Sequence, residues 1–236
     1  RVDAATRGGD ARRRLERDAH HQVLAAGNAA ENAAGVIAQK AFRRQLVAML
    51  LAAPEFERDK VLLIGSGAIG TFVLAGIKKL YKAEVTVLDF GGSRLERAAR
   101  LGADHTVEVG DNAEAEIKKV FGESGIDVVI EASGAPGQLQ AAIGLVKRGG
   151  NILQVGLPSS KQEIDVHKIV MSEINIQTTL AHVCDQDLGP ALEILASTTL
   201  ADELIEGVYP LSEISHQLEL LGSGKIQGKV LFDPSL

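Results

Sequence analysis

The chain has 236 residues, of which 45% are hydrophobic, so it can form one large or two small domains with a substantial core. The net charge of −6 argues against a nucleic-acid partner, and no uninterrupted apolar run reaches the roughly 18 residues that a membrane span needs. The single cysteine excludes an internal disulfide and a four-cysteine zinc site, and it favours a reducing, cytoplasmic setting.

Residues 1–58 differ in composition from the rest of the chain. They carry a net charge of +3 with nine arginines and one lysine, whereas residues 59–236 carry −9 and favour lysine over arginine. Fifteen alanines and few strand-forming residues predict a helical N-terminal segment that ends before Pro54. The change in residue usage suggests that the two parts differ in origin, as in a fusion or an altered N-terminus.

From Lys60 onward, short apolar segments alternate with segments of helical periodicity. The six strand candidates are Val61–Ile64, Glu84–Leu88, His105–Val109, Asp127–Glu131, Asn151–Val155 and Ile174–Thr179. This alternation predicts an α/β fold over residues 59–199, in which a doubly wound parallel six-stranded sheet of the Rossmann type has helices on both faces.

Helical segments separate these strands. The segment 93–101 carries its own start and stop signals, because Ser93 and Glu96 form a possible capping box and Gly102 follows the last residue. The remaining elements are helices at 69–80, 112–121, 187–196 and 212–221 and extended segments at 204–209 and 229–232. Residues 200–236 are interpreted as an appended C-terminal helix and strand.

The first strand candidate continues directly into a glycine-rich turn, Gly65-Ser66-Gly67-Ala68-Ile69-Gly70. In this GxGxxG pattern, Gly65 allows the tight turn, Gly67 lets phosphates approach the backbone, and Gly70 allows the next helix to pack on the strand. The unpaired N–H groups that begin the helix, around Ala68 and Ile69, then face the pyrophosphate of a dinucleotide. The motif is weak alone, but its place between a strand and a helix strengthens it.

The second strand candidate ends just before Asp89, nineteen residues after Gly70. A carboxylate there can accept hydrogen bonds from the two hydroxyls of an adenosine ribose and repel a 2′-phosphate. The sequence therefore predicts NAD rather than NADP, although Arg94 is a cation that could receive a 2′-phosphate. The structural alternative is that Asp89 only caps the turn before Gly91-Gly92.

Later strand ends point toward the same edge of the sheet, because ligands of doubly wound sheets collect at the carboxyl ends of the strands. Small residues follow the fourth strand at Ser133-Gly134, and Val155-Gly156-Leu157 follows the fifth. A third strand end lies at Thr178-Thr179-Leu180. Such residues would let a flat nicotinamide ring approach the backbone, although each segment could equally be a simple strand-to-loop turn.

From about Asp59 to Pro234, the sequence resembles the nucleotide-binding and C-terminal part of the medium-chain, zinc-type alcohol and polyol dehydrogenases. The matching segments, in chain order, are 61–70, Arg94-Leu95 with Ala98, 101–105, 125–134, 149–158, 209–211 and 228–231. The resemblance implies that Asp89 and Arg94 hold the adenosine ribose and that the backbone near Ser133, Val155 and Leu157 meets the nicotinamide half. It also implies a 3-2-1-4-5-6 strand order and dimerisation through the sheet edge.

Zinc ligands are the main departure from this family. The resemblance implies zinc as a cofactor, held by cysteine, histidine and carboxylate ligands upstream, where it acts as a Lewis acid on the alcohol. Residues 1–58 contain no cysteine, and the adjacent His20 and His21 would point apart on a helix. His182 and Cys184 are too few for a metal site. No metal ligands and no catalytic residues are therefore predicted.

The leading interpretation is an NAD-dependent oxidoreductase of the alcohol or polyol dehydrogenase type, present mainly as its cofactor-binding part. Its substrate would be a small alcohol or polyol. Two alternatives stay open, namely a non-catalytic NAD-binding or sensing module and a truncated or chimeric product. A homo-oligomer is expected, with neither nucleic acid nor a membrane as a partner.

Overall fold

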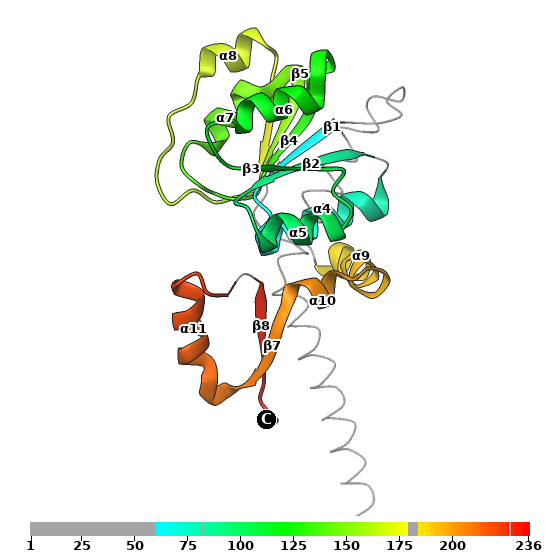
Figure 1. Ribbon diagram of the computed structural model, residues 1–236, viewed down its shortest axis with the longest axis vertical. Helices are drawn as coiled ribbons and strands as arrows, with labels where there is room; N and C mark the ends of the chain where they lie inside the picture. Colours follow the sequence, from blue (N-terminus) through cyan, green and yellow to red (C-terminus); the bar gives the residue numbers. More distant parts are fainter. Residues whose placement is uncertain (1–59, 82, 179–183, 227) are drawn as a thin grey trace, which may run out of the picture.

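The computed structural model describes residues 60–236 except 82, 179–183 and 227, and for residues 184–190 it describes the backbone alone (Figure 1). The predicted helical segment 1–58 lies outside the described residues. So do the strand end at Thr179-Leu180 and the side chains of His182 and Cys184.

Six parallel strands form the main sheet in the order β3-β2-β1-β4-β5-β6 (Figure 1). The strands are β1 (Lys60–Ile64), β2 (Glu84–Asp89), β3 (His105–Glu108), β4 (Ile126–Glu131), β5 (Val146–Gln154) and β6 (Asn175–Thr178). The chain reverses its direction of travel across the sheet between β1 and β4, where doubly wound folds bind their ligands. The predicted doubly wound sheet and its strand order are confirmed.

β5 begins earlier than the sequence pattern predicted. It starts at Val146 rather than Asn151, and Val146 pairs with Ile126 before the register shifts between Ile126 and Val128. The polar and glycine residues 147–150 interrupt the apolar run of this strand. Hydrophobic periodicity therefore places the start of the strand after them.

Helices cover both faces of the sheet. They are α4 (Ala68–Leu80), α5 (Ser93–Arg100), α6 (Ala113–Phe121), η2 (Gly122–Ser124), α7 (Gln138–Leu145) and α8 (Val166–Met171). Leu63 of β1 packs with Ile77 of α4 in one core, whereas Leu62 packs with Ile143 of α7 in the core on the opposite face. Because both faces of β1 are covered, its sequence is a continuous apolar run rather than an alternating one.

The start of α5 differs from the predicted capping box. Ser93 is already the first helical residue, Gly92 is the N-cap, and no side chain caps the helix, so Ser93 and Glu96 do not form the box. Gly92 has a φ of 78°, which glycine adopts readily and serine does not, and the helix therefore starts one residue earlier than a serine N-cap would. The predicted stop is confirmed, because the Gly102 N–H donates to the Ala99 carbonyl oxygen at 3.0 Å.

The C-terminal residues form a second, two-stranded sheet. The elements are α9 (Cys184–Ser197), α10 (Leu200–Leu204), β7 (Ile205–Pro210), η3 (Leu211–Glu213), α11 (Ile214–Gly222) and β8 (Lys229–Asp233). β7 and β8 pair in parallel, and α11 connects them (Figure 1). Leu200 and Leu204 belong to the core that covers α4, and Arg100 of α5 donates two hydrogen bonds to Glu203. The domain boundary at residue 199 stays a prediction.

None of the helices in the described part of the chain combines the length and the apolar character that crossing a lipid bilayer would require.

Candidate cofactor-binding site

The glycine turn between β1 and α4 is closely packed at two positions and open at one. Gly65 has a φ of 90°, and a Cβ added there would lie 2.8 Å from the Cβ of Ser133. A Cβ on Gly70 would overlap the carbonyl oxygen of Gly65. Gly67, by contrast, is the N-cap of α4, and among the described residues beyond its two chain neighbours no atom lies within 4 Å of an added Cβ. The space beside Gly67 therefore faces away from the packed interior.

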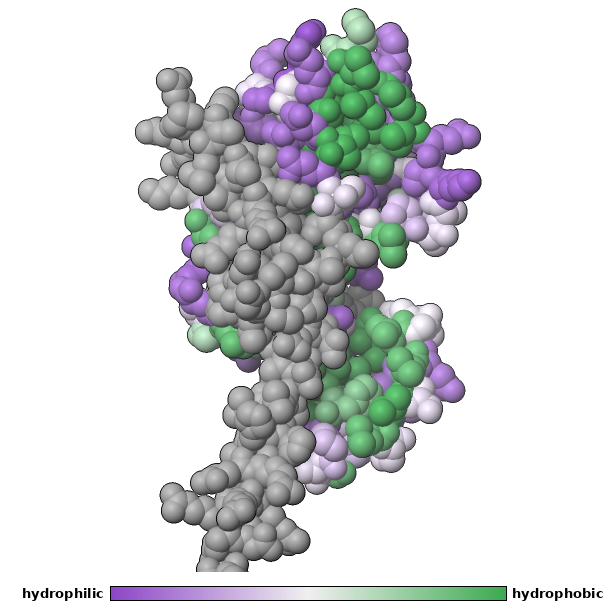
Figure 2. Space-filling view, turned by 180° about the vertical axis from the view of Figure 1, so that it is seen from behind, coloured by the Kyte–Doolittle hydropathy of each residue, from purple (hydrophilic) through white to green (hydrophobic). Residues whose placement is uncertain are grey.

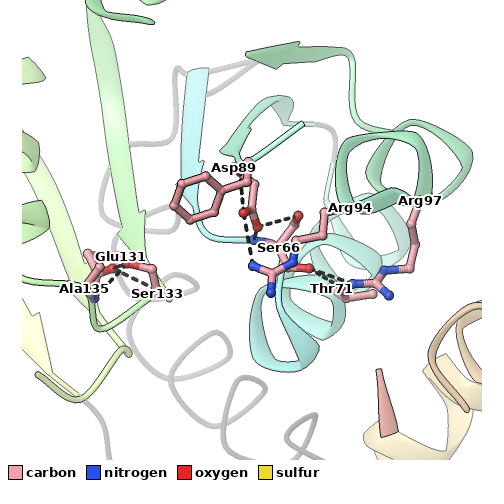
Figure 3. A network of polar contacts seen from close by, with 9 residues as sticks. Ser66, Thr71, Asp89, Arg94, Arg97, Glu131, Ser133 and Ala135 are labelled. Carbon is pink, nitrogen blue, oxygen red and sulfur yellow. Dashed lines mark hydrogen bonds and ion pairs between the residues drawn. The ribbon is translucent and has the colours of Figure 1, made fainter. Parts of the chain in front are cut away.

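Asp89 ends β2 with its carboxylate buried against this turn (Figure 3). Oδ2 accepts hydrogen bonds from the Ser66 N–H at 2.5 Å and the Ser66 hydroxyl at 2.8 Å. Oδ1 accepts from the Phe90 N–H at 2.6 Å and from the Arg94 guanidinium at 3.3 Å. These four donors match the roughly four acceptor positions of a carboxylate. An incoming hydroxyl would have to replace one of the two side-chain donors.

Arg97 and Thr71 hold the same turn from the opposite side (Figure 3). The Arg97 guanidinium donates to the Ser66 carbonyl oxygen at 3.0 Å, and the Thr71 hydroxyl donates to that oxygen at 2.9 Å. Burial and the neighbouring Arg94 lower the pKa of Arg97 from its usual value. Sequence reasoning did not single out Arg97 or Thr71. The one available signal was the position of Arg97 one helical turn after Arg94.

Glu131, at the end of β4, is the second buried carboxylate of this edge. Oε1 accepts hydrogen bonds from the Ser133 N–H at 2.8 Å, the Gly134 N–H at 3.0 Å and the Ser133 hydroxyl. Oε2 accepts from the side-chain amide of Gln154, which also donates to the Gly156 carbonyl oxygen at 2.7 Å. Sequence reasoning quoted Glu131 and Gln154 within longer motifs but assigned neither a role.

The residues predicted at the later strand ends lie side by side. The N–H groups of Val155 and Gly156 both donate to the Glu131 carbonyl oxygen at 2.8 Å. A Cβ on Gly134 would lie 2.8 Å from the carbonyl oxygen of Leu157, so the turns after β4 and β5 are in direct contact. Leu157 is 79% exposed and projects from this edge, whereas Val155 is buried in the core.

The predicted site residues therefore form one row along the carboxyl edge of the sheet. Asp89 joins the end of β2 to Ser66 in the turn after β1, and Gly65 in the same turn contacts Ser133 after β4. Ser133 in turn bonds to Glu131, which is tied to β5. The row extends across the ends of β2, β1, β4 and β5.

Metal ligands do not gather anywhere in the described part of the chain. Among residues 60–236, apart from those whose placement or side chain is not described, no three His, Cys, Asp or Glu side chains are close enough to hold a metal ion.

A family model described as zinc-binding dehydrogenase matches residues 68–197, which is more than half of the chain. The chain belongs to this zinc-binding dehydrogenase family. The matched segment begins at the first residue of α4 and ends at the last residue of α9. The resemblance to the zinc-type alcohol and polyol dehydrogenases is thereby confirmed.

Curated relatives of the chain include polyol dehydrogenases. The chain is 30% identical to erythritol/L-threitol dehydrogenase of Mycolicibacterium smegmatis over 179 residues, which cover 75% of this chain and 49% of the relative. It is 31% identical to sorbitol dehydrogenase of Bacillus subtilis over 162 residues, which cover 67% of this chain and 45% of the relative. The chain spans about half the length of the curated relatives it matches.

Solved structures of dehydrogenases share the fold. 2R,3R-butanediol dehydrogenase of Bacillus subtilis superposes with a TM-score of 0.71 at 24% identity, covering 86% of this chain and 56% of that one. An alcohol dehydrogenase of Thermotoga maritima gives a TM-score of 0.74 at 22% identity, covering 87% and 56%. A short chain alcohol dehydrogenase of E. coli, solved in complex with NADH, gives 0.68 at 22% identity, covering 84% and 56%.

Proposed function

We propose that the sheet domain binds NAD along the carboxyl ends of β2, β1, β4 and β5, as the cofactor-binding part of an alcohol or polyol dehydrogenase. The observation that carries this proposal is the contrast within the glycine turn. The fold leaves no room for a Cβ on Gly65 or Gly70, whereas no described residue beyond its chain neighbours crowds a Cβ on Gly67. A packed turn with one open glycine suits a backbone that a phosphate must approach. Ala68 and Ile69 add the first N–H groups of α4 to this pyrophosphate site.

The adenosine ribose would bind at Asp89 and Arg94. Its two hydroxyls would take the acceptor positions that the Ser66 hydroxyl and the Arg94 guanidinium occupy in the free protein. The backbone N–H groups of Ser66 and Phe90 would keep the carboxylate in place during the exchange. A buried carboxylate at this point disfavours a 2′-phosphate, which supports NAD over NADP.

The nicotinamide half would lie against Ser133, Val155, Gly156 and Leu157. Their turns are in contact and form a continuous backbone surface beside the phosphate turn. Bound NAD would supply the hydride acceptor, and these residues would orient its ring. The names of the polyol dehydrogenase relatives support a small alcohol or polyol as the substrate. The described residues offer no ligand set for the zinc in the family's name.

A homo-oligomer would form through the β6 edge of the sheet. β6 is the last strand of the sheet and pairs with β5 alone among the described strands. The neighbouring helix α8 exposes Val166, Val170 and Met171, each of them 59–68% accessible. Figure 2 shows apolar side chains gathered at the end of the molecule where Figure 1 places α8. An edge strand beside exposed apolar side chains is suited to contact with a second copy.

An NADH titration of the wild-type chain and Gly67→Ala tests the binding proposal. Gly67 has a φ of −63°, which alanine adopts without strain, and an added Cβ meets no atom of the described residues beyond its chain neighbours. The variant should therefore unfold at the wild-type urea midpoint but bind NADH at least ~10-fold more weakly, because the Cβ occupies the space of a phosphate. Absence of wild-type binding, or unchanged affinity in Gly67→Ala, would contradict the proposal.

Turnover separates the enzyme from the alternative of an NAD-binding module. The purified chain would be screened with NAD and a panel of alcohols and polyols, in parallel with metal analysis. NAD reduction by this chain would establish a dehydrogenase, whereas NADH binding without turnover would favour a binding or sensing module.

A further inference from the structure

We propose that Glu131 is a positioning residue for the nicotinamide end of the cofactor site. Its buried carboxylate holds the turn after β4 and the turn after β5 against each other, and thereby fixes the surface on which the nicotinamide ring lies. This inference rests on the proposed function and assigns a role to a buried group that makes no contact with the cofactor in that proposal.

The carboxylate of Glu131 is buried among hydrogen-bond donors and not in an ion pair with a described residue. The side chain is 1% exposed, and none of the ion pairs between described residues involves it. Burying an ionised carboxylate is costly unless hydrogen-bond donors surround it. Here the donors are the N–H groups of Ser133 and Gly134, the Ser133 hydroxyl and the Gln154 amide.

These donors come from two different turns. Ser133 and Gly134 follow β4, whereas Gln154 ends β5 and stands opposite Glu131 in the strand register. The Gln154 amide donates to the Glu131 carboxylate and to the Gly156 carbonyl oxygen. It therefore connects Glu131 to the turn after β5. The Glu131 main chain adds its carbonyl oxygen, which accepts the N–H groups of Val155 and Gly156.

The two turns fit each other closely. A Cβ on Gly134 would lie 2.8 Å from the Leu157 carbonyl oxygen, and one on Gly156 would overlap the Gly134 nitrogen. Contact alone does not fix two irregular turns, whereas a charged acceptor shared between them does, since hydrogen bonds to ionised groups are roughly twice as strong as neutral ones.

The substitution Glu131→Gln replaces one carboxylate oxygen with an NH₂ group at nearly constant volume. If that NH₂ faces Gln154, two donors oppose each other, and a turned Gln154 amide would direct its oxygen at the Gly156 carbonyl. If it faces Ser133 and Gly134, it opposes their N–H groups. Either arrangement removes a hydrogen bond between residue 131 and one of its partners at the two turns, while the hydrogen bonds between Asp89 and Ser66 stay intact.

The experiment compares two ligands that share the adenine end. NADH binding is measured by fluorescence, and ADP-ribose, which lacks the nicotinamide ring, is measured by calorimetry. For Glu131→Gln we expect NADH affinity to fall by ~10-fold, the scale of one lost charged hydrogen bond, with ADP-ribose affinity within twofold of wild type. Equal losses for both ligands, or no loss of NADH affinity, would overturn the assignment of Glu131.

Two further variants complete this test. Thr86→Val is the matched control, because it removes a fully buried hydroxyl that has no hydrogen-bond partner among the described residues. Thr86 lies on β2, away from both turns, so this variant should bind NADH and ADP-ribose as wild type does. Gln154→Met removes the donor that links the turns and keeps Glu131; it should show the same selective loss of NADH affinity, and decides the matter if Glu131→Gln does not fold. If the wild-type chain binds neither ligand, the proposed function fails instead.

Discussion

The adenine and nicotinamide ends of the proposed site are each built around one buried carboxylate, but the two carboxylates are held differently. Asp89 has two backbone donors and two side-chain donors, Ser66 and the partly exposed Arg94. Glu131 is surrounded by the turn amides, the Ser133 hydroxyl and the buried Gln154. The first can therefore exchange donors with a ligand, whereas the second is committed to the fold.

This difference separates direct recognition of the ligand by Asp89 from positioning of the turns by Glu131. A carboxylate with replaceable donors recognises the ligand directly, so its removal should weaken every ligand that carries the ribose. A carboxylate with fixed donors acts through the turns it holds, so its removal should weaken only what those turns contact. Four substitutions probe this contrast.

The largest effect is expected for Gly156→Ala at the nicotinamide end. An added Cβ would collide with the Gly134 nitrogen and come within 2.5 Å of the Glu131 carboxylate, so the turns after β4 and β5 would be forced apart. Urea unfolding should show that the free energy of unfolding falls by about 3 kcal/mol, as for severe overpacking. The control is Gly144→Ala in α7, where an added Cβ meets nothing and alanine favours the helix. A wild-type midpoint for Gly156→Ala would mean that the turns are not rigidly held.

Asp89→Ala should weaken cofactor binding by roughly 1 to 3 kcal/mol, because the ribose loses a buried charged acceptor. In contrast to Glu131→Gln, the loss should be equal for NADH and ADP-ribose, which both carry the ribose. Calorimetric titration of both ligands measures it, with the exposed Asp111→Ala as control. Unchanged affinity would show that Asp89 is only a cap of the turn, the alternative that the sequence left open.

Ser66→Ala is expected to tighten NADH binding slightly, by up to ~1 kcal/mol, the scale of one neutral hydrogen bond. The change frees an acceptor position on Asp89 from which the ribose otherwise has to displace the Ser66 hydroxyl. The matched change at the other end, Ser133→Ala, removes a hydroxyl from Glu131 and should bring no gain, since no ligand group replaces it. Weaker NADH binding by Ser66→Ala would show that this hydroxyl assists the cofactor.

The smallest effect should come from a carboxylate outside both ends. Asp104 accepts hydrogen bonds from Lys78 at 2.8 Å and from the Val85 N–H at 2.7 Å. Partial burial raises the pKa of Asp104, but these two hydrogen bonds, together with the charges of Lys78 and His105, outweigh it and leave the pKa below its usual value. The contribution to stability is therefore fully present above the pKa of an unfolded aspartate and is lost as the pH falls through the lower folded pKa.

Asp104→Asn should consequently cost about 0.5 kcal/mol at neutral pH, since the side chain is partly solvated and its ion pair is screened. The difference from wild type should disappear in acid, which urea midpoints measured across the pH range would show. Cofactor affinity should not change, and a change would mean that the contact between α4 and β2 influences the adenine end.

The fold could be predicted because its signals are local. β1, β2 and β4 are buried on both faces and stand out as short apolar runs, and Gly102 marks the end of α5. The start of β5 was missed because its first residues are polar or glycine, and the capping box was wrong because Gly92 offers a backbone conformation that serine does not. The hydrophobic pattern of the sequence reveals neither the true start of β5 nor the backbone conformation of Gly92.

The site was predictable only where a motif fixes the geometry. The glycine turn and Asp89 follow from spacing along the chain, and the structure brings them together. The link between Glu131 and Gln154 depends instead on the register between β4 and β5, which sets two residues 23 positions apart opposite each other. Periodicity within a strand carries no information about its alignment with the next one, so this link became visible only in three dimensions.

The contact between Gly65 and Ser133 has a consequence for how such chains diverge. The two positions share one small volume, since a side chain on the first would lie 2.8 Å from the Cβ of the second. Whether a larger side chain fits at either position therefore depends on the residue at the other, although 67 residues of chain separate them. Over evolutionary time we expect small residues to be retained at both positions together, because the glycine turn and the end of β4 share this volume.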